Sequence, residues 1–260
     1  MTSTSATVET RITDLLKTFK LPTVAEEVVP RFRQGGQDQA LVHLLEVLEL
    51  EAQDRRDRRT VRLRRSAGLP PGKTFDTLDE TRFPRPLVRL WRELAAGEFL
   101  ERATNVLAFG KPGVGKSHVA SALGHALIEA GHSVLFTPTF ALVQQLQAAK
   151  RALDLPRLLR KLDYFELLIL DDLGYIRQSP EDAEVLFTLL AERYERRSVM
   201  LTSNLLFSQW DRIFQNEMTT AAAIDRLVHH SVVLEFNLDS YRGEVAEKAK
   251  KSRTKSKEKQ

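Results

Sequence analysis

Eight residues near the middle of the chain, GKPGVGKS at 110–117, combine residue types and a spacing that suit phosphate binding. They match the pattern G-x-x-x-x-G-K-[S/T] through Gly110, Gly115, Lys116 and Ser117. Glycines let the backbone curl so that successive N–H groups face one anion at the positive end of the following helix. We expect Lys116 to reach the β- and γ-phosphates of ATP, and the Ser117 hydroxyl to take one position on Mg²⁺.

The segments on either side of this loop favour a phosphate site over the alternative, a glycine-rich turn without a ligand. The apolar run NVLAF (105–109) precedes the loop as a predicted strand, and SHVASALGHALIEAG (117–131) follows it as a predicted helix. A phosphate cradle requires this order of strand, loop and helix. The residues predicted to contact the nucleotide are Gly110, Lys111, Pro112, Gly113, Val114, Gly115, Lys116, Ser117 and His118.

Two adjacent carboxylates follow a second apolar run in LLILDDLG (167–174). Ligand sites in open α/β sheets lie at the carboxyl ends of strands, so we expect Asp171 and Asp172 near the loop. Asp171 is assigned to Mg²⁺, and Asp172 to orienting or activating the attacking water. One of the two could instead cap a helix. In hydrolytic relatives, the acid that follows the metal-binding aspartate is often Glu. Asp is one carbon shorter, so we expect hydrolysis to be slow or to depend on assembly.

A side-chain amide, Asn204, ends the predicted strand SVMLTSN (198–204). If this strand lies between the loop strand and the Asp171 strand, the amide faces the γ-phosphate and can hold the attacking water. A turn-forming asparagine is the alternative.

An arginine lies in AAAIDRLVHH (221–230), ahead of the last predicted strand. Arg226 can neutralise charge in the transition state if a neighbouring subunit supplies it, or it can be an ordinary surface residue. The predicted catalytic set is Lys116, Asp172, Asn204 and Arg226. His229 and His230 lack nearby partners at metal-ligand spacing and are interpreted as structural.

The segments that position these residues alternate between strands and helices after residue 74. The predicted strands are 105–109, 133–137, 164–170, 198–204 and 231–236, and the predicted helices are 117–131, 140–162 with a break at Pro156, 181–197 and 219–230. This order predicts an α/β fold with a parallel sheet covered on both faces. Residues 8–65 read as helices only, before a Gly- and Pro-rich break at 66–74. We expect a helical N-terminal domain at 1–68, an ATPase domain at 69–243, and a basic disordered tail at 244–260.

Composition excludes several classes of protein. The chain has 260 residues, of which 42% are hydrophobic and 28% are charged, as in ordinary soluble proteins. The absence of cysteine excludes disulfides, thiolate metal sites and cysteine catalysis. No apolar run approaches a membrane span, and the first twenty residues lack a signal peptide's apolar centre, so we expect a cytoplasmic protein with no membrane partner.

The motifs and their order resemble the IstB-like helper ATPases of insertion sequences, within the AAA+ clade that also contains the DnaC-type helicase loaders. The residues that carry the resemblance are FLERATNVLAFGKPGVGKSHVASALGHAL, LLILDDLGYI, LTSN and AIDRLVHHSVVLEF. The resemblance implies a five-stranded parallel AAA+ sheet, ATP bound between subunits, and a ring or spiral of identical chains around DNA. It further implies capture of target DNA and recruitment or activation of a partner transposase. Arg226 matches the arginine-finger position, and Arg242 is a weaker candidate for a second phosphate sensor.

Two basic segments are candidates for DNA contact. The first is the run from Arg55 to Arg65, and the second is the extra helical stretch at 140–162, which the resemblance places along a central channel. The candidate phosphate contacts are Arg55, Arg56, Arg58, Arg59, Arg62, Lys150, Arg151, Arg157, Arg160 and Lys161. Either segment could instead be a solvated face, and the first could bind an acidic partner. Without a base-reading module, we expect duplex binding with little sequence preference.

The ATPase core alone leaves two partners open, and a third class remains beside them. A transposition helper would bind a transposase, whereas a DnaC-like loader would bind a replicative helicase. The third possibility is a nucleotide-gated DNA scaffold that does not hydrolyse ATP.

Overall fold

The chain divides into two compact units at Arg62 and Leu63 in the computed structural model, which describes residues 2–174, 179–214 and 216–238. Helix α3 (Asp38–Ser66) continues through this division. It ends at Ser66, where the Gly- and Pro-rich segment 66–74 begins. Arg242 and the tail predicted at 244–260 lie outside the described residues. Within the described ranges, none of the helices combines the length and the apolar character that a membrane span requires.

The N-terminal unit consists of helices, as the sequence predicts. Helices α1 (Thr2–Thr18) and α2 (Pro22–Gln34) precede α3. Ile12 and Leu16 of α1 pack with Ala25 of α2 and Leu41 of α3 in a small apolar core. Each helix therefore buries one apolar stripe against the other two.

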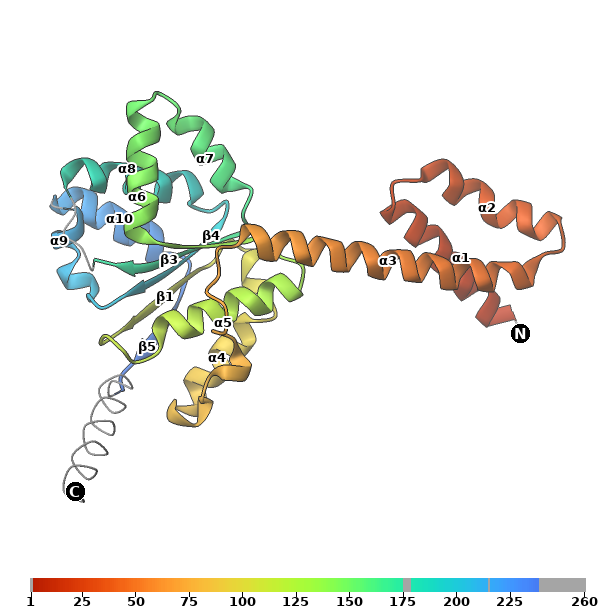
Figure 1. Ribbon diagram of the computed structural model, residues 1–260, viewed down its shortest axis with the longest axis horizontal. Coiled ribbons are helices and arrows are strands. Elements are labelled where there is room, and N and C mark those ends of the chain that lie inside the picture. The colour runs from red at the N-terminus through yellow and green to blue at the C-terminus, as the bar shows by residue number, and fades with distance from the viewer. Residues whose placement is uncertain (1, 175–178, 215, 239–260) are drawn as a thin grey trace, which may run out of the picture. The chain divides into compact units, whose positions relative to one another are not determined.

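The second unit is built on a five-stranded parallel sheet in the order β2-β3-β4-β1-β5, which confirms the predicted α/β fold (Figure 1). The strands are β1 (Asn105–Gly110), β2 (Val134–Pro138), β3 (Leu167–Leu173), β4 (Ser198–Ser203) and β5 (Ser231–Phe236). Strand β4 lies between β3 and β1, as the predicted role of Asn204 requires.

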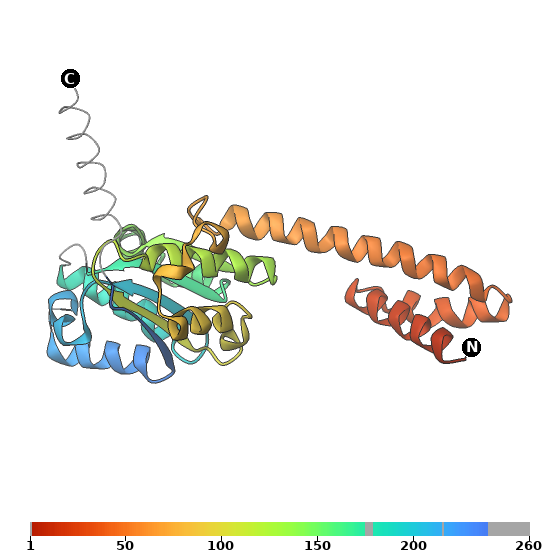
Figure 2. The same cartoon turned by 90° about the horizontal axis from the view of Figure 1, so that it is seen from below.

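Helices cover both faces of this sheet (Figures 1 and 2). The helices of this unit are α4 (Arg85–Leu94), α5 (Lys116–Glu129), α6 (Thr139–Arg151), α7 (Leu155–Asp163), α8 (Pro180–Arg193), α9 (Asp211–Phe214) and α10 (Glu217–Val228). Alternate residues of β1 serve the two cores, because Val106 and Ala108 pack with α4 and α5, whereas Leu107 and Phe109 pack with α6, α8 and α10. Both faces of β1 are thus covered by apolar side chains, so functional polar groups are confined to the strand ends.

Several element boundaries differ from those predicted. The break in the 140–162 helix falls at residues 152–154, and Pro156 lies in the first turn of α7, where a missing N–H costs nothing. Strand β3 starts at Leu167, because Tyr164 still caps α7, and it runs through both aspartates to Leu173. Helix α4 was not predicted, although its buried residues Leu87, Trp91 and Leu94 recur at helical spacing.

Candidate nucleotide-binding site

The glycine loop joins the end of β1 to the start of α5. Gly113 and Gly115 have φ angles of 82° and 109°, in the left-handed region that favours glycine. The Lys116 side chain is buried, and its Nζ donates hydrogen bonds to the carbonyl oxygens of Gly110 at 2.7 Å and Lys111 at 3.0 Å. The loop therefore holds a positive charge at the first turn of α5, beside the N–H groups of that helix.

A pocket of about 560 Å³ opens over this loop, a size that suits a small-molecule ligand. Loop residues 112–118 line it, together with Asp172, Asn204 and part of the segment 73–83. Gly110 and Lys111 are not among the described lining residues and contribute the carbonyls that hold Lys116. The loop, the end of β3 and the residue after β4 thus meet at one cavity, as the sequence predicts for a nucleotide site.

The segment 73–83 is the part of the pocket that sequence reasoning missed. It contains two short 3₁₀ helices, Phe75–Thr77 and Glu80–Arg82. The Nε2 atom of His118 lies 3.0 Å from the carbonyl oxygen of Thr74 and 3.2 Å from Oγ1 of Thr77. These two contacts anchor the segment to α5. The Phe83 ring closes over Gly115, where an added Cβ would lie 3.1 Å from Cζ. No motif marks this wall, because it forms only when residues 41 positions apart make contact.

The two acids lie on a bulge of β3. The β3–β4 ladder pairs Leu170 with Leu201 and Leu173 with Ser203, so Asp171 and Asp172 together face Thr202. The Thr202 hydroxyl donates to Oδ1 of Asp171 at 2.5 Å and accepts the N–H of Asp172 at 2.9 Å. Asp172 has a φ of 58°, which is uncommon outside glycine, and its side chain lines the pocket, whereas Asp171 is half-buried beside it.

Asn204 follows β4 directly and lines the pocket with Asp172. The turn that carries it is fixed by Ser203, whose Oγ donates to the Leu173 carbonyl at 2.8 Å and accepts the N–H of Leu205 at 3.1 Å. The exposed amide therefore faces the cavity from a rigid backbone.

Arg226 lies away from the pocket of its own chain. Its Nη1 donates to the Ala222 carbonyl at 2.9 Å, and its guanidinium lies 4.9 Å from the centre of the Phe187 ring. The carbonyl oxygen of Arg226 accepts a hydrogen bond from Nδ2 of Asn105, which is the first residue of β1. The glycine loop begins at the other end of this strand. About 17 Å of strand therefore separates the two ends, more than an arginine side chain spans.

The two candidate DNA-binding segments differ in how many of their cations are paired. On α3, Arg55 and Arg58 pair with Glu51 and Asp54 at 2.6 and 2.7 Å. On α6, Lys150 pairs with Glu184 at 2.5 Å. Within the described part of the chain, no acidic group pairs with the exposed side chains of Arg151, Arg157, Arg160 and Lys161. The helical stretch α6–α7 thus presents the more available positive charge.

A parallel sheet in this order, with a phosphate loop after β1 and acids at the end of β3, defines a P-loop nucleotide-binding protein of the AAA+ class. Residues 14–249 match the family described as IstB-like ATP binding protein, and the chain belongs to this family. The resemblance inferred from the motifs is thereby confirmed.

Individual relatives agree with this assignment. A protein of Sinorhizobium fredii named as an insertion sequence ATP-binding protein is 43% identical over 249 residues, which cover 94% of this chain and 83% of the relative. The protein named as the ATP-binding protein of insertion sequence IS21 of Pseudomonas aeruginosa is 43% identical over 178 residues, covering 68% of this chain and 67% of its own. The crystal structure of the DnaC helicase loader matches with a TM-score of 0.52 at 20% identity, covering 61% of this chain and 95% of that chain. This last likeness shows the fold.

Proposed function

We propose that this chain is an ATP-hydrolysing, DNA-binding helper of transposition, which assembles on target DNA and recruits or activates a transposase. Membership of the IstB-like family and the insertion-sequence names of its relatives support the biological setting. The observation that carries the ATPase activity is the meeting of Lys116, Asp172 and Asn204 at one pocket from three separate strand ends.

Each of these three side chains has a distinct task in phosphoryl transfer. The Lys116 ammonium binds the β- and γ-phosphate oxygens. These oxygens then replace the loop carbonyls to which it donates hydrogen bonds in this structure. The Asp172 carboxylate orients the attacking water and accepts its proton, and the Asn204 amide fixes the direction of attack. The bulge directs Asp172 into the pocket, so this side chain can act on the attacking water although it is one carbon shorter than Glu. We expect slow hydrolysis in the isolated chain.

The donor set beside the loop fits Mg²⁺. The Ser117 hydroxyl lines the pocket, and the Asp171 carboxylate is held by Thr202 at the neighbouring strand end. Both supply hard oxygen ligands, which Mg²⁺ prefers. When bound, Mg²⁺ would supply positive charge beside the triphosphate and offset the negative charge that develops during phosphoryl transfer. Ser117 and Asp171 are the residues that would hold it.

The location of Arg226 supports assembly of identical chains. The arginine cannot reach the pocket of its own chain, but it is half-buried at the opposite end of the sheet, where a neighbour's pocket could meet it. ATP would then bridge two chains and couple nucleotide binding to oligomer formation. Sedimentation velocity with ATP, duplex DNA and both together tests this coupling. We expect a large complex only with both, and a chain that stays monomeric throughout would contradict it.

The Arg226→Ala variant separates the trans role from a surface role. We expect ATP binding by the single chain to be unchanged, and ATP hydrolysis and assembly on DNA to fall by at least tenfold. Arg212→Ala, on the short helix α9, is the matched control. If Arg226→Ala assembles and hydrolyses ATP normally, the arginine has no part in the neighbour's site.

The cations of α6 and α7 are proposed to contact DNA phosphates. Affinity should then fall steeply with salt and depend little on sequence. Arg157→Ala should weaken binding and flatten the salt dependence, whereas Lys150→Ala should have the smaller effect, because Glu184 already pairs with that ammonium. Binding that hardly changes between low and moderate salt would exclude a phosphate-dominated contact.

The DnaC-like fold favours a second candidate, a loader of a replicative helicase. Both functions use the same ATPase core, so the partner decides between them. The full chain, with ATP and DNA, should retain the transposase of its own insertion sequence on a column. Retention of the host's hexameric helicase instead would favour the loader.

A further inference from the structure

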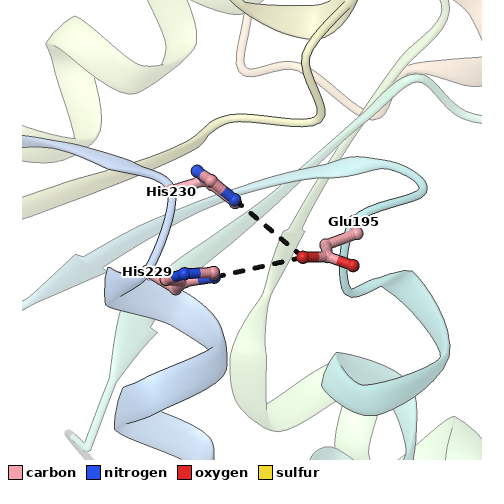
Figure 3. Close-up of side chains that lie close together, drawn as sticks. All are labelled: Glu195, His229 and His230. Atoms are coloured by element: carbon pink, nitrogen blue, oxygen red, sulfur yellow. Dashed lines mark ion pairs between the residues drawn. The ribbon is translucent and has the colours of Figure 1, made fainter.

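Two adjacent histidines and a glutamate far from them in the sequence lie close together (Figure 3). They lie near the amino ends of β4 and β5, whereas the pocket lies at the carboxyl ends of the strands. His229 and His230 connect α10 to β5, and Glu195 lies in the turn between α8 and β4. The Oε1 atom of Glu195 is 4.0 Å from Nδ1 of His229 and 3.9 Å from Nε2 of His230. The three ligand atoms all lie within 4.8 Å of one another. Sequence spacing could not show this, because strand β4 and helices α9 and α10 lie between Glu195 and the histidines.

The backbone that carries the histidines is fixed by Asn105. The N–H of Asn105 donates to the His230 carbonyl at 2.7 Å, and its Nδ2 donates to the Leu227 carbonyl at 3.2 Å. Its Oδ1 accepts the N–H of Val199 on β4 at 2.9 Å. A single buried side chain therefore ties the α10–β5 connection to the strand that follows the Glu195 turn.

The turn that carries Glu195 is held by a second buried side chain. Arg193 is 2% exposed, and its guanidinium donates to the carbonyls of Leu162, Phe165 and Ser198 at 2.9–3.0 Å. Glu195 itself has a φ of 56°, and the N–H groups of the next two residues both bond to the Arg193 carbonyl at 3.0 Å. The three ligand side chains thus project from preorganised backbone, which lowers the entropy lost when an ion binds them.

We propose that Glu195, His229 and His230 form a binding site for a divalent transition-metal ion such as Zn²⁺. Two imidazoles and one carboxylate suit Zn²⁺, Ni²⁺ or Cu²⁺ better than Mg²⁺. Ligand atoms about 2.1 Å from a tetrahedral ion lie about 3.4 Å apart. The two Glu195–histidine separations must therefore close by roughly half an ångström, and the separation between the two imidazole nitrogens, which is at most 4.8 Å, by up to about 1.4 Å. More than half of each side chain is exposed, so rotation can supply this movement and solvent can fill the remaining position.

Binding exchanges one existing contact. The Tyr194 Oη lies 2.8 Å from Nδ1 of His229 and would give up this hydrogen bond to the ion. The exchange occurs at the solvent-exposed surface, where water can take over the hydrogen bond of the Tyr194 hydroxyl. The ion would join the α8–β4 turn to the end of α10, the helix that also carries Arg226. The site requires neither the nucleotide nor DNA, so its test is independent of the proposed function.

Zinc titration of the full chain, prepared without a polyhistidine tag, tests the site. Excess Mg²⁺ is kept present so that the glycine loop does not compete for Zn²⁺. We expect one zinc ion per chain by isothermal titration calorimetry, and an affinity lowered about tenfold or more in His230→Gln and Glu195→Gln. His43→Gln is the matched control, because, in the part of the chain that the structure describes, His43 pairs with a single carboxylate, that of Glu46. Circular dichroism and ATP binding should match among all four proteins.

A second measurement locates the ion directly. Paramagnetic Co²⁺ should broaden the imidazole proton signals of His229 and His230 in NMR spectra before those of the other four histidines. The proposal is overturned if the unchanged protein shows no saturable zinc binding, if Glu195→Gln and His230→Gln bind zinc as tightly as it does, or if the first signals to broaden belong to other histidines.

Discussion

The two ends of the parallel sheet carry different kinds of polar architecture. At the carboxyl ends of the strands, Lys116, Asp172 and Asn204 face an open pocket. At the amino ends, Asn105 and Arg193 are buried and satisfy backbone carbonyls and N–H groups of neighbouring elements. The first end keeps its polar groups available to a ligand, whereas the second uses them to hold the fold and to fix the backbone of the half-buried Arg226 and the exposed His230.

This difference agrees with a general property of parallel sheets. Connections at the carboxyl ends lead into helix N-termini, whose N–H groups attract anions, so chemistry gathers there. The amino ends receive helix C-termini, whose unpaired carbonyls need donors. Asn105 and Arg193 supply those donors. Changes at the two ends should therefore separate, with activity lost at one end and stability lost at the other.

The largest expected effect is that of Asp172→Asn at the pocket. We expect ATP hydrolysis to fall by about 100-fold or more, because the amide cannot accept a proton from the attacking water. ATP affinity and the free energy of unfolding should stay close to their original values. Phosphate release with and without DNA measures the change, and Asp154→Asn, in the turn before α7, is the control. Undiminished phosphate release would instead remove Asp172 from the reaction.

A comparison of two asparagines tests the other end. Asn105→Ala removes three hydrogen bonds to backbone groups, two of them fully buried, and should lower the free energy of unfolding by about 2 kcal/mol in urea titrations. Asn204→Ala, at the exposed residue that follows β4, should change stability by less than about 0.5 kcal/mol but slow hydrolysis. If both variants lose stability equally, the functional division between the two ends does not hold.

Thr202 sharpens the comparison, because it is buried at the pocket end and acts on both acids. Thr202→Val keeps the shape but leaves the Asp172 N–H without its acceptor and frees the Asp171 carboxylate. We expect hydrolysis to fall about tenfold, equivalent to about 1.4 kcal/mol, with a smaller loss in ATP affinity. Thr202→Ser, which retains the hydroxyl, should restore the rate. Failure of the serine variant to do so would show that the methyl group, and not the hydrogen bonds, matters.

The sequence was most informative where a functional residue directly follows an apolar strand. The glycine loop, the paired acids and Asn204 were predicted because each follows an apolar strand, and strand ends in a parallel sheet converge. The bulge at Asp172 and its support by Thr202 were not predicted, since strand register depends on pairing with β4. The wall formed by residues 73–83 and the grouping of Glu195 with His229 also depend on long-range contacts, which no local pattern encodes.

The smallest expected effect concerns Glu166, at the amino end of β3. Partial burial alone would favour its neutral form, but hydrogen bonds from the Ser133 N–H and hydroxyl, with His132 beside it, hold the pKa of this carboxyl below its usual value. Because the folded-state pKa is the lower one, the ionised group stabilises the fold above about pH 4.3, and this contribution is lost as pH falls through the folded-state value. Glu166→Gln should therefore cost less than about 1 kcal/mol near neutral pH, and the difference from the unchanged protein should shrink in acid. Urea unfolding between pH 3 and about pH 7 measures this difference, and a gap that stays constant would show that Glu166 acts only through its shape and uncharged contacts.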